Sequence, residues 1–349
     1  MLAGLAGLAL ASGCAFESGV GESTGASQGA ISGGEPAPDD FAVVGLLNGH
    51  GACSGTLIAP NLVLTAHHCV AESPAGNVLC GKATFGPTWT NDMSVTTRDV
   101  IFAIWRDHVA SIEVPPGAND VCGGDVAVLF LDQNVEPSEA WPIPPRIDQD
   151  PSPGEPYRAV GFGGTADDGS GAGMRRQRDG LAVGCVGESC VPIYGVQADE
   201  WMGETGICPG DSGGPALDDV GRVIGVTSRG GPNCSTPIYS GVVPWADWLK
   251  QMGAKAAQQG GYEPWPWVTG GSTMPLEPPE AGPEASVVAE APALRVAGGC
   301  AVGEGRAAGA GAWLIAAAGA LAVLRLHGRG GRVADRGVRR AREHGVENA

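Results

Sequence analysis

The residues best suited to chemistry lie in a short segment around a serine, residues 208–215, with the sequence CPGDSGGP. Its glycines and prolines predict a tight turn that leaves backbone N–H groups unobstructed beside Ser212. A hydroxyl is a poor nucleophile unless a neighbouring base removes its proton. Ser212 is therefore a candidate nucleophile if the chain also supplies a histidine and a buried carboxylate.

Both partners are present upstream. The segment TAHHC at residues 65–69 carries two adjacent histidines, His67 and His68, and Asp125 stands directly before an apolar run. A carboxylate at the start of a buried strand is costly unless it is hydrogen-bonded, and an imidazole N–H is a suitable donor. Asp120 and Asp132 lack a following apolar run and are weaker candidates.

The order histidine, aspartate, serine and the flanking residues resemble the chymotrypsin/trypsin-like serine protease family. The matching segments run from ISGG at residue 31 to VPWADWL at residue 249, roughly two thirds of the chain. The resemblance implies a serine endopeptidase that cuts protein or peptide substrates through an acyl-enzyme, with no cofactor and no metal. It assigns the nucleophile to Ser212, the orienting carboxylate to Asp125 and the general base to His68, with His67 as the competing base.

The resemblance also implies the groups that surround the reaction. Backbone N–H groups of Gly210 and Ser212 would form the oxyanion hole. Gly206, six residues before the nucleophile, would lie at the floor of the specificity pocket, with Ser228 and Gly230 in its walls. Because the floor residue has no countercharge, we expect small or apolar residues before the scissile bond rather than lysine or arginine. Arg229, between the wall residues, is expected to be a solvated loop charge.

Ile31 resembles the mature N-terminus of the family. The resemblance implies a zymogen in which cleavage before Ile31 frees an ammonium that pairs with Asp211 and orders the oxyanion turn. The preceding residue is Ala30, so the activating protease would prefer small residues. The alternative function is a non-catalytic protease homologue that serves as a cell-surface binding module.

Composition points to an exported protein. The chain has 349 residues and a net charge of −17, which argues against nucleic acid as a partner. Four cysteine pairs suggest an oxidising compartment. Cys53–Cys69 is expected to bracket the histidine loop, and Cys208–Cys234 the serine loop. Cys185–Cys190 would close a small loop, and Cys80–Cys122 would pair across the domain.

The N-terminal residues 1–30 read as an export signal and pro-segment. Residues 1–13 are small and apolar, and the sequence ASGC that ends at Cys14 resembles a lipoprotein box, which predicts a possible membrane attachment through a lipidated Cys14. Residues 15–30 are rich in glycine, serine, glutamate and glutamine, which is typical of a flexible segment.

The body, residues 31–256, is predicted to be the protease domain. Short alternating apolar runs separated by turns indicate an all-β fold. The family resemblance makes this two packed antiparallel β-barrels, with the catalytic cleft between them. A short C-terminal helix is expected around residues 245–252, where the apolar residues have helical spacing.

The C-terminal part has a different composition. Residues 257–298 are rich in proline, glutamate, alanine and glycine and are predicted to be a linker. Residues 299–349 contain Cys300, an uncharged run from Ala307 to Leu324 and seven arginines between Arg325 and Arg342. This layout resembles the MYXO-CTERM type of sorting signal and predicts a membrane anchor with its arginines on the cytoplasmic side, processed at Cys300 by a sorting protease.

Overall fold

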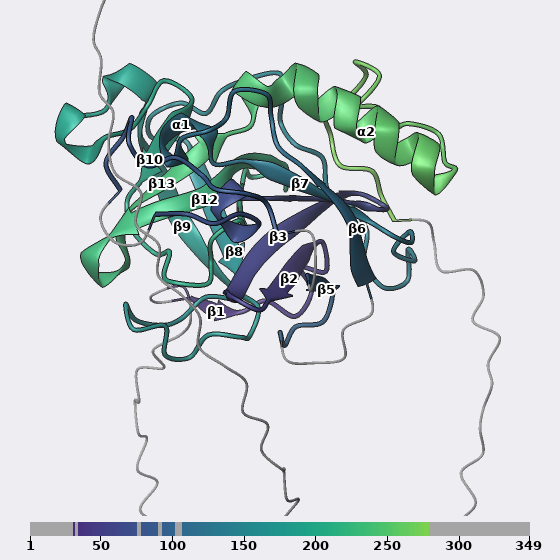
Figure 1. Cartoon of the computed structure of the whole chain (residues 1–349), viewed down its shortest axis with the longest axis horizontal. Helices are drawn as coiled ribbons and strands as arrows, with labels where there is room; N and C mark the ends of the chain where they lie inside the picture. The colour runs from purple at the N-terminus through teal and green to yellow at the C-terminus, as the bar shows by residue number, and fades with distance from the viewer. Residues whose placement is uncertain (1–30, 32–33, 75–77, 90–92, 102–106, 279–349) are drawn as a thin grey trace, which may run out of the picture. The chain divides into compact units, whose positions relative to one another are not determined.

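A computed structural model describes residues 31, 34–74, 78–89, 93–101 and 107–278 (Figure 1). The chain divides into two units, Met1–Ala285 and Ser286–Ala349, and all described residues belong to the first. The expectations for residues 1–30, for Cys14 and Cys300, and for the sorting tail lie outside the described residues.

The first half of the domain forms a closed antiparallel barrel. Its strands pair in the order β2-β3-β4-β7-β6-β5, and β5 returns to pair with β2. Their bounds are β2 Val43–Asn48, β3 Gly51–Ala59, β4 Leu62–Thr65, β5 Ser94–Thr96, β6 Asp107–Glu113 and β7 Ala127–Leu131. The apolar runs that predicted strands fill the interior, where Leu57, Leu64 and Phe130 are fully buried.

The second half forms another antiparallel barrel. Its sheet order is β1-β9-β10-β13-β12-β11-β8, and an additional pairing of β8 with β9 closes the ring, with β1 at its edge. The strands are β1 Glu35–Pro36, β8 Pro156–Gly161, β9 Arg176–Val186, β10 Glu200–Gly203, β11 Pro215–Leu217, β12 Val223–Gly231 and β13 Ser235–Gly241. Trp201 stacks on Tyr239 in this core, with ring centroids 4.2 Å apart. The predicted all-β fold with two barrels is confirmed.

The helical elements of the described residues are short except for the last one. They are η1 His67–Cys69, α1 Val121–Gly124, η2 Gly187–Ser189, η3 Pro192–Tyr194, η4 Pro232–Cys234, η5 Val243–Trp245 and α2 Ala246–Gly260. Helix α2 lies along one side of the barrels (Figure 1), and the residue that follows it, Gly261, has a φ of 70°, which suits a helix C-terminus. In the part of the chain that the structure describes, no helix is long and apolar enough to cross a membrane.

The predicted linker boundary at residue 257 is wrong, because folded structure continues to residue 278. Helix α2 runs past the predicted boundary to Gly260, and the following segment buries Trp265 and Trp267 against the core. The Trp141 indole N–H donates to the Leu276 carbonyl at 2.8 Å. The tryptophans bury enough apolar surface to fix a segment that has no regular periodicity.

All four predicted disulfides are present: Cys53–Cys69, Cys80–Cys122, Cys185–Cys190 and Cys208–Cys234. They close loops with sequence separations of 16, 42, 5 and 26 residues, respectively. Each bridge restricts the unfolded chain, a contribution that is typically about 2–4 kcal/mol.

Candidate active site

Two neighbouring strands of the first barrel bring the histidine and the aspartate together. Strands β4 and β7 are antiparallel, and Thr65 at the end of β4 pairs with Ala127 at the start of β7. His68 lies in the short helix directly after β4, and Asp125 lies two residues before β7. The strand register therefore places both side chains at the same edge of the barrel.

Asp125 is a fully buried carboxylate whose two oxygens are both occupied. One oxygen accepts the backbone N–H of His68 at 2.9 Å, and the other lies 2.7 Å from His68 Nδ1. That second oxygen also accepts the Ser228 hydroxyl at 2.6 Å. These contacts fix the imidazole orientation, since Nδ1 faces Asp125 and leaves Nε2 as the nitrogen directed away from it. Ser228 was predicted as a pocket wall, and its hydroxyl holds Asp125 as well.

The charges of this pair reinforce each other. Burial alone would lower the pKa of His68, but the adjacent Asp125 carboxylate raises it above the ordinary value of 6.5. Burial alone would raise the pKa of Asp125, but His68 and Ser228 lower it. Asp125 is therefore held ionised, and it favours the imidazolium form of His68.

The competing histidine has different surroundings. The His67 ring is buried and lies on Phe85, with ring centroids 3.8 Å apart. Its Nδ1 has no hydrogen-bond partner among the described residues, and burial lowers its pKa. The imidazole that contacts Asp125 is thus His68, and His67 is a packing residue behind it.

The turn that carries Ser212 packs directly on the loops of the first barrel. The Ser212 carbonyl accepts the Ser54 N–H at 2.8 Å and lies 3.5 Å from the Cys69 sulfur. Gly213 has a φ of 81°, and a Cβ at this position would overlap the Thr65 hydroxyl and the Ser54 carbonyl. The glycine after Ser212 therefore permits the close approach that brings the serine turn to the histidine loop.

The backbone N–H groups of Gly210 and Ser212 have no hydrogen-bond acceptor among the described residues. The Gly210 carbonyl is held by the Ser54 hydroxyl at 2.9 Å, whereas neither the Gly210 N–H nor the Ser212 N–H donates a hydrogen bond within the described residues. Backbone N–H groups in folded proteins are nearly always paired. The two free amides, which flank Asp211, are therefore available to an acceptor on a bound molecule.

Asp211 is almost fully buried directly before Ser212. Its two oxygens accept N–H groups of Gly163 and Cys208, both at 2.8 Å. Burial raises the pKa of Asp211 to about 7, and the two N–H donors only partly oppose this effect. Ile31 is fully buried in the same barrel, with its Cγ2 atom 3.4 Å from the position that a Cβ of Gly206 would occupy.

A cavity of about 490 Å³ opens beside Ser212. Ile207, Thr227 and the wall segment 228–232 line it, and Gly206 lies next to it, since its N–H donates to the Cys234 carbonyl at 3.0 Å. Arg229 is not a solvated loop charge, because both of its terminal nitrogens pair with the buried carboxylate of Glu200, at 2.5 and 2.7 Å. Sequence inspection missed this ion pair, whose partners are 29 residues apart.

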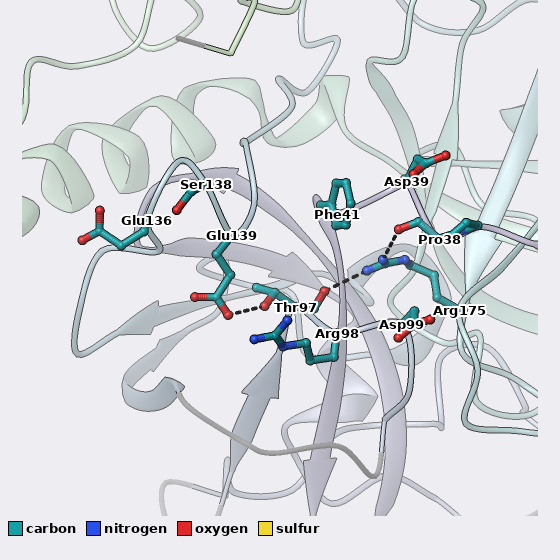
Figure 2. Close-up of a pocket in the computed structure, with 10 residues that line it drawn as sticks. All are labelled: Pro38, Asp39, Phe41, Thr97, Arg98, Asp99, Glu136, Ser138, Glu139 and Arg175. Atoms are coloured by element: carbon teal, nitrogen blue, oxygen red, sulfur yellow. Dashed lines mark hydrogen bonds between the residues drawn. The ribbon is translucent and has the colours of Figure 1, made fainter. Parts of the chain in front are cut away.

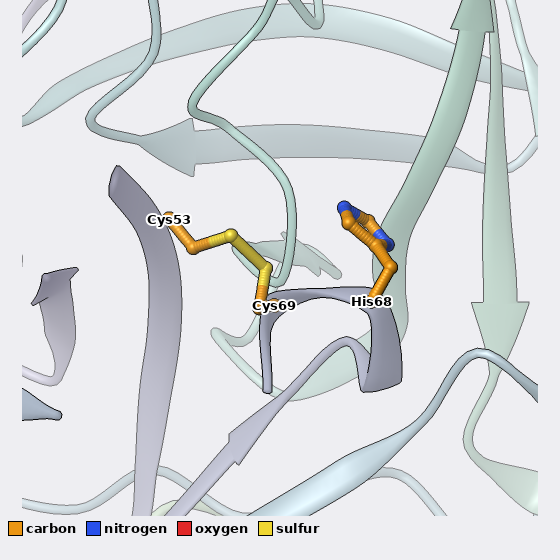
Figure 3. A group of neighbouring side chains, drawn as sticks. All are labelled: Cys53, His68 and Cys69. Carbon is orange, nitrogen blue, oxygen red and sulfur yellow. A yellow bond between two sulfur atoms is a disulfide. The ribbon is translucent and has the colours of Figure 1, made fainter. Parts of the chain in front are cut away.

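Figure 3 shows Cys53, His68 and Cys69, whose potential ligand atoms lie within 4.8 Å of one another. The two sulfurs are joined in a disulfide and are not available as thiolate ligands. Cys53 and Cys69 therefore brace the histidine loop, and this donor set does not suit a metal ion.

A second cavity, of about 540 Å³, lies apart from the predicted site residues (Figure 2). The guanidinium of Arg175 is buried at its wall and donates to backbone carbonyls of the segments around it, namely those of Ala37, Pro38, Val43 and Thr97. Glu139 accepts the Thr97 hydroxyl at 2.6 Å. The Arg175 contacts tie the residue directly before β9 to the first barrel and to the segment that precedes it.

Two closed barrels and a histidine–aspartate pair beside a serine turn define a chymotrypsin-like protein. Comparison with known proteins agrees with this class. The model of the trypsin family matches residues 31–249, and the chain belongs to that family.

Individual relatives are similar to the same part of the chain. A trypsin from Saccharopolyspora erythraea is 31% identical over 209 residues, which cover 56% of this chain and 82% of that protein. Scolexin B from Heliothis virescens is 27% identical over 231 residues, which cover 58% of this chain and 75% of that protein. Among solved structures, a mutant of human heparin binding protein (CAP37) has a TM-score of 0.50 at 19% identity, and the match covers 63% of this chain and 95% of that one.

Proposed function

We propose that this protein is a serine endopeptidase that hydrolyses peptide bonds through an acyl-enzyme. The observation that carries the proposal is the buried Asp125 carboxylate on His68 Nδ1, at 2.7 Å, beside the turn of Ser212. The chain belongs to a family of serine peptidases. The three groups that the reaction needs, Ser212, His68 and Asp125, lie on adjacent loops.

The proposed mechanism follows from the roles that the geometry permits. His68 Nε2 removes the proton of the Ser212 hydroxyl as its oxygen attacks the peptide carbonyl, and Asp125 stabilises the imidazolium that forms. The amine leaves with that proton, and an acyl ester remains on Ser212. Water then attacks the ester with His68 again as the base, which releases the acid and restores the hydroxyl.

The free N–H groups of Gly210 and Ser212 would hold the negative oxygen of each tetrahedral intermediate. Such donors act where the charge develops, and the loss of one typically costs about 3–4 kcal/mol of transition-state stabilisation. A preformed hole of this kind needs no rearrangement during the reaction.

The pH dependence of the reaction follows from the raised pKa of His68. Only the neutral imidazole accepts the serine proton, so we expect kcat/KM to rise with pH through an apparent pKa above 6.5. The measurement is a pH profile of peptide hydrolysis by the processed enzyme. In the Asp125→Asn variant the residual activity should rise at lower pH, because the carboxylate that raises the pKa is gone. A His108→Gln variant, which changes an exposed histidine, should keep the original profile.

We further propose that the protein is made as a zymogen that is activated by cleavage before Ile31. The buried Asp211 carboxylate has backbone N–H donors but no cation partner among the described residues. Ile31 is buried in the same barrel, so an ammonium on this residue would supply the missing charge. An ion pair there would stabilise the turn that presents the Gly210 and Ser212 amides.

The zymogen proposal predicts that the uncut chain and processed Asp211→Asn are both weak enzymes. We expect each to lose at least about 100-fold in kcat relative to the processed chain, which is the cost of a disturbed oxyanion hole. The measurement is peptide hydrolysis, with mass spectrometry to locate the new N-terminus. Asp219→Asn, at an exposed position, is the matched control. Full activity of the uncut chain would refute the zymogen and leave the protease intact.

The alternative is a protease homologue without activity that binds partners at the cell surface. Free oxyanion amides and a fully hydrogen-bonded Asp125 favour the enzyme, because a binding module has no need of either. Reaction with a fluorophosphonate, which needs an activated serine, separates the two functions.

The proposed cellular location is outside the cytoplasm. Four disulfides and the extracellular character of many trypsin relatives support export. Membrane attachment through Cys14 or through the apolar run after Cys300 is part of this proposal and rests on the sequence pattern alone. The mass spectrum that locates the mature N-terminus also shows whether the mature chain ends near Cys300, which tests the proposed cleavage there.

A further inference from the structure

An arginine lies beside Gly206, the residue proposed for the floor of the specificity pocket. Arg178 in β9 pairs directly with Ala159 in β8, and Ala159 is buried in the interior of the second barrel. Residues that face each other in an antiparallel pair have their side chains on the same side of the sheet. The Arg178 side chain therefore enters the barrel interior from its edge.

Gly206 leaves the room that Arg178 occupies. A Cβ on Gly206 would lie 3.2 Å from Arg178 Cδ and 3.6 Å from its Nη1. The guanidinium is thus placed where a side chain of residue 206 would extend. The expectation of an uncharged floor was based on Gly206 alone, and it did not consider Arg178, which reaches the same position from another strand.

Two buried hydroxyls lie at the same end of the barrel. Tyr157 and Tyr239 have their rings edge to face, with centroids 5.6 Å apart, and their buried hydroxyls lie near enough to each other that each shifts the pKa of the other. Burial raises the pKa of Tyr157 to about 12, although Arg178 acts to lower it, so the phenol keeps its proton at neutral pH. Arg178 also acts on the pKa of Tyr239, and its charge therefore reaches both hydroxyls. One hydroxyl of such a pair can still donate to an acceptor that arrives with a ligand, because each carries its own O–H.

Carboxylates on Asp167, Asp211 and Glu204 lie in this region. Asp167 lines the cavity beside Ser212, and its oxygens accept the N–H groups of Asn233 and Cys234. Asp211 is the buried carboxylate of this region, and in the processed enzyme the Ile31 ammonium would neutralise it. Glu204 is exposed and remains in contact with water. Arg178 has a hydrogen-bond or charge partner of its own, but a guanidinium has five N–H donors and can serve a second acceptor.

We propose that Arg178 determines specificity and that the preferred peptides carry aspartate or glutamate immediately before the cleaved bond. The inference rests on the proposed function. The carboxylate would enter the cavity beside Ser212 along Ile207 and Cys234, and it would accept N–H groups of Arg178 and a tyrosine hydroxyl at the floor. Charge-assisted hydrogen bonds in a buried site are strong enough to decide between an acid and its amide.

The test compares peptides that differ only in this residue. The processed enzyme is given peptidyl coumarin amides with Glu, Gln, Asp, Asn, Leu or Lys before the scissile bond. We expect kcat/KM for the acids to exceed that for the isosteric amides by about 10- to 100-fold. Lysine should be the poorest of the set, because it meets a like charge.

The variant Arg178→Met keeps an unbranched, largely apolar stem and removes the guanidinium with its charge. It should lose the preference for acids over amides, so that its kcat/KM for the Glu peptide falls to about that for the Gln peptide. Arg98→Gln removes an exposed arginine that lines the separate cavity of Figure 2 and is the control for a general change in charge.

The outcomes separate this inference from the proposed function. Labelling and cleavage of the leucine peptide without any preference for Glu over Gln would refute the role of Arg178 and leave the protease standing. Absence of both labelling and cleavage would refute the protease and this inference with it. The ratio of kcat/KM for the Glu and Gln peptides in the unchanged enzyme tests the proposed preference for acids even if Arg178→Met does not fold.

Discussion

The variant Ser212→Ala is expected to lose peptide hydrolysis, by about 10⁶-fold in kcat, while its fold stays intact. The hydroxyl would form the acyl-enzyme, and no other group of the site is placed to do so. The anchoring contacts of the turn use the Ser212 carbonyl, which accepts Ser54 N–H at 2.8 Å, and the substitution keeps that carbonyl. The measurement pairs kcat on a peptide substrate with the thermal unfolding temperature.

The control for this variant is Ser138→Ala, which removes a hydroxyl from an exposed position on the other cavity. It should have the activity and stability of the unchanged enzyme. Retained hydrolysis in Ser212→Ala would show that another residue is the nucleophile. An unfolded Ser212→Ala would show that the hydroxyl is needed for the structure instead.

The second large effect is expected for Asp125→Asn, which should lower kcat by about 10⁴-fold. An amide that donates toward His68 Nδ1 favours the tautomer with the proton on Nε2, and that nitrogen then cannot accept the serine proton. The change is nearly isosteric, so the geometry should survive. The measurement is kcat of the processed variant, with near-ultraviolet circular dichroism to follow the packing of the aromatic residues.

Asp132→Asn is the matched control, because Asp132 is exposed and lies in the loop after β7. It should leave kcat unchanged. Ser228→Ala removes the hydroxyl that donates to Asp125 at 2.6 Å and should have an intermediate effect. If Asp125→Asn kept full activity, the imidazole would not depend on this carboxylate and the proposed mechanism would be wrong.

The triad candidates could be proposed from the sequence because each stands in a short local motif that resembles the family. Gly213 after Ser212 permits the close approach of the turn, and the apolar run after Asp125 specifies a buried strand. Cysteine pairs that bracket the histidine and serine loops also identified two of the four disulfides. Where a short segment determines the local geometry, the sequence was sufficient to propose the candidate residues.

The sequence was insufficient where contacts depend on strand register. Arg178 reaches Gly206 only because β8 and β9 pair with Ala159 opposite Arg178, and a pattern of residue types does not specify this register. The ion pair between Arg229 and Glu200 was missed for the same reason.

The boundary of the domain was missed for a different reason. Residues 257–278 have the proline, glycine and glutamate content of a linker, but Trp265 and Trp267 anchor the segment in the core. Large aromatic side chains contribute much buried area at isolated positions, so periodicity is a poor guide to such a segment.

The most direct test of the account is covalent labelling of the processed protein with a fluorophosphonate, followed by mass spectrometry of its peptides. The account predicts one adduct, on the Ser212 hydroxyl, in a chain that begins at Ile31, and no adduct in Ser212→Ala or after denaturation. A processed, folded protein that is not labelled, or that is labelled at another serine, would contradict the assignment of this site as the active site of a serine endopeptidase.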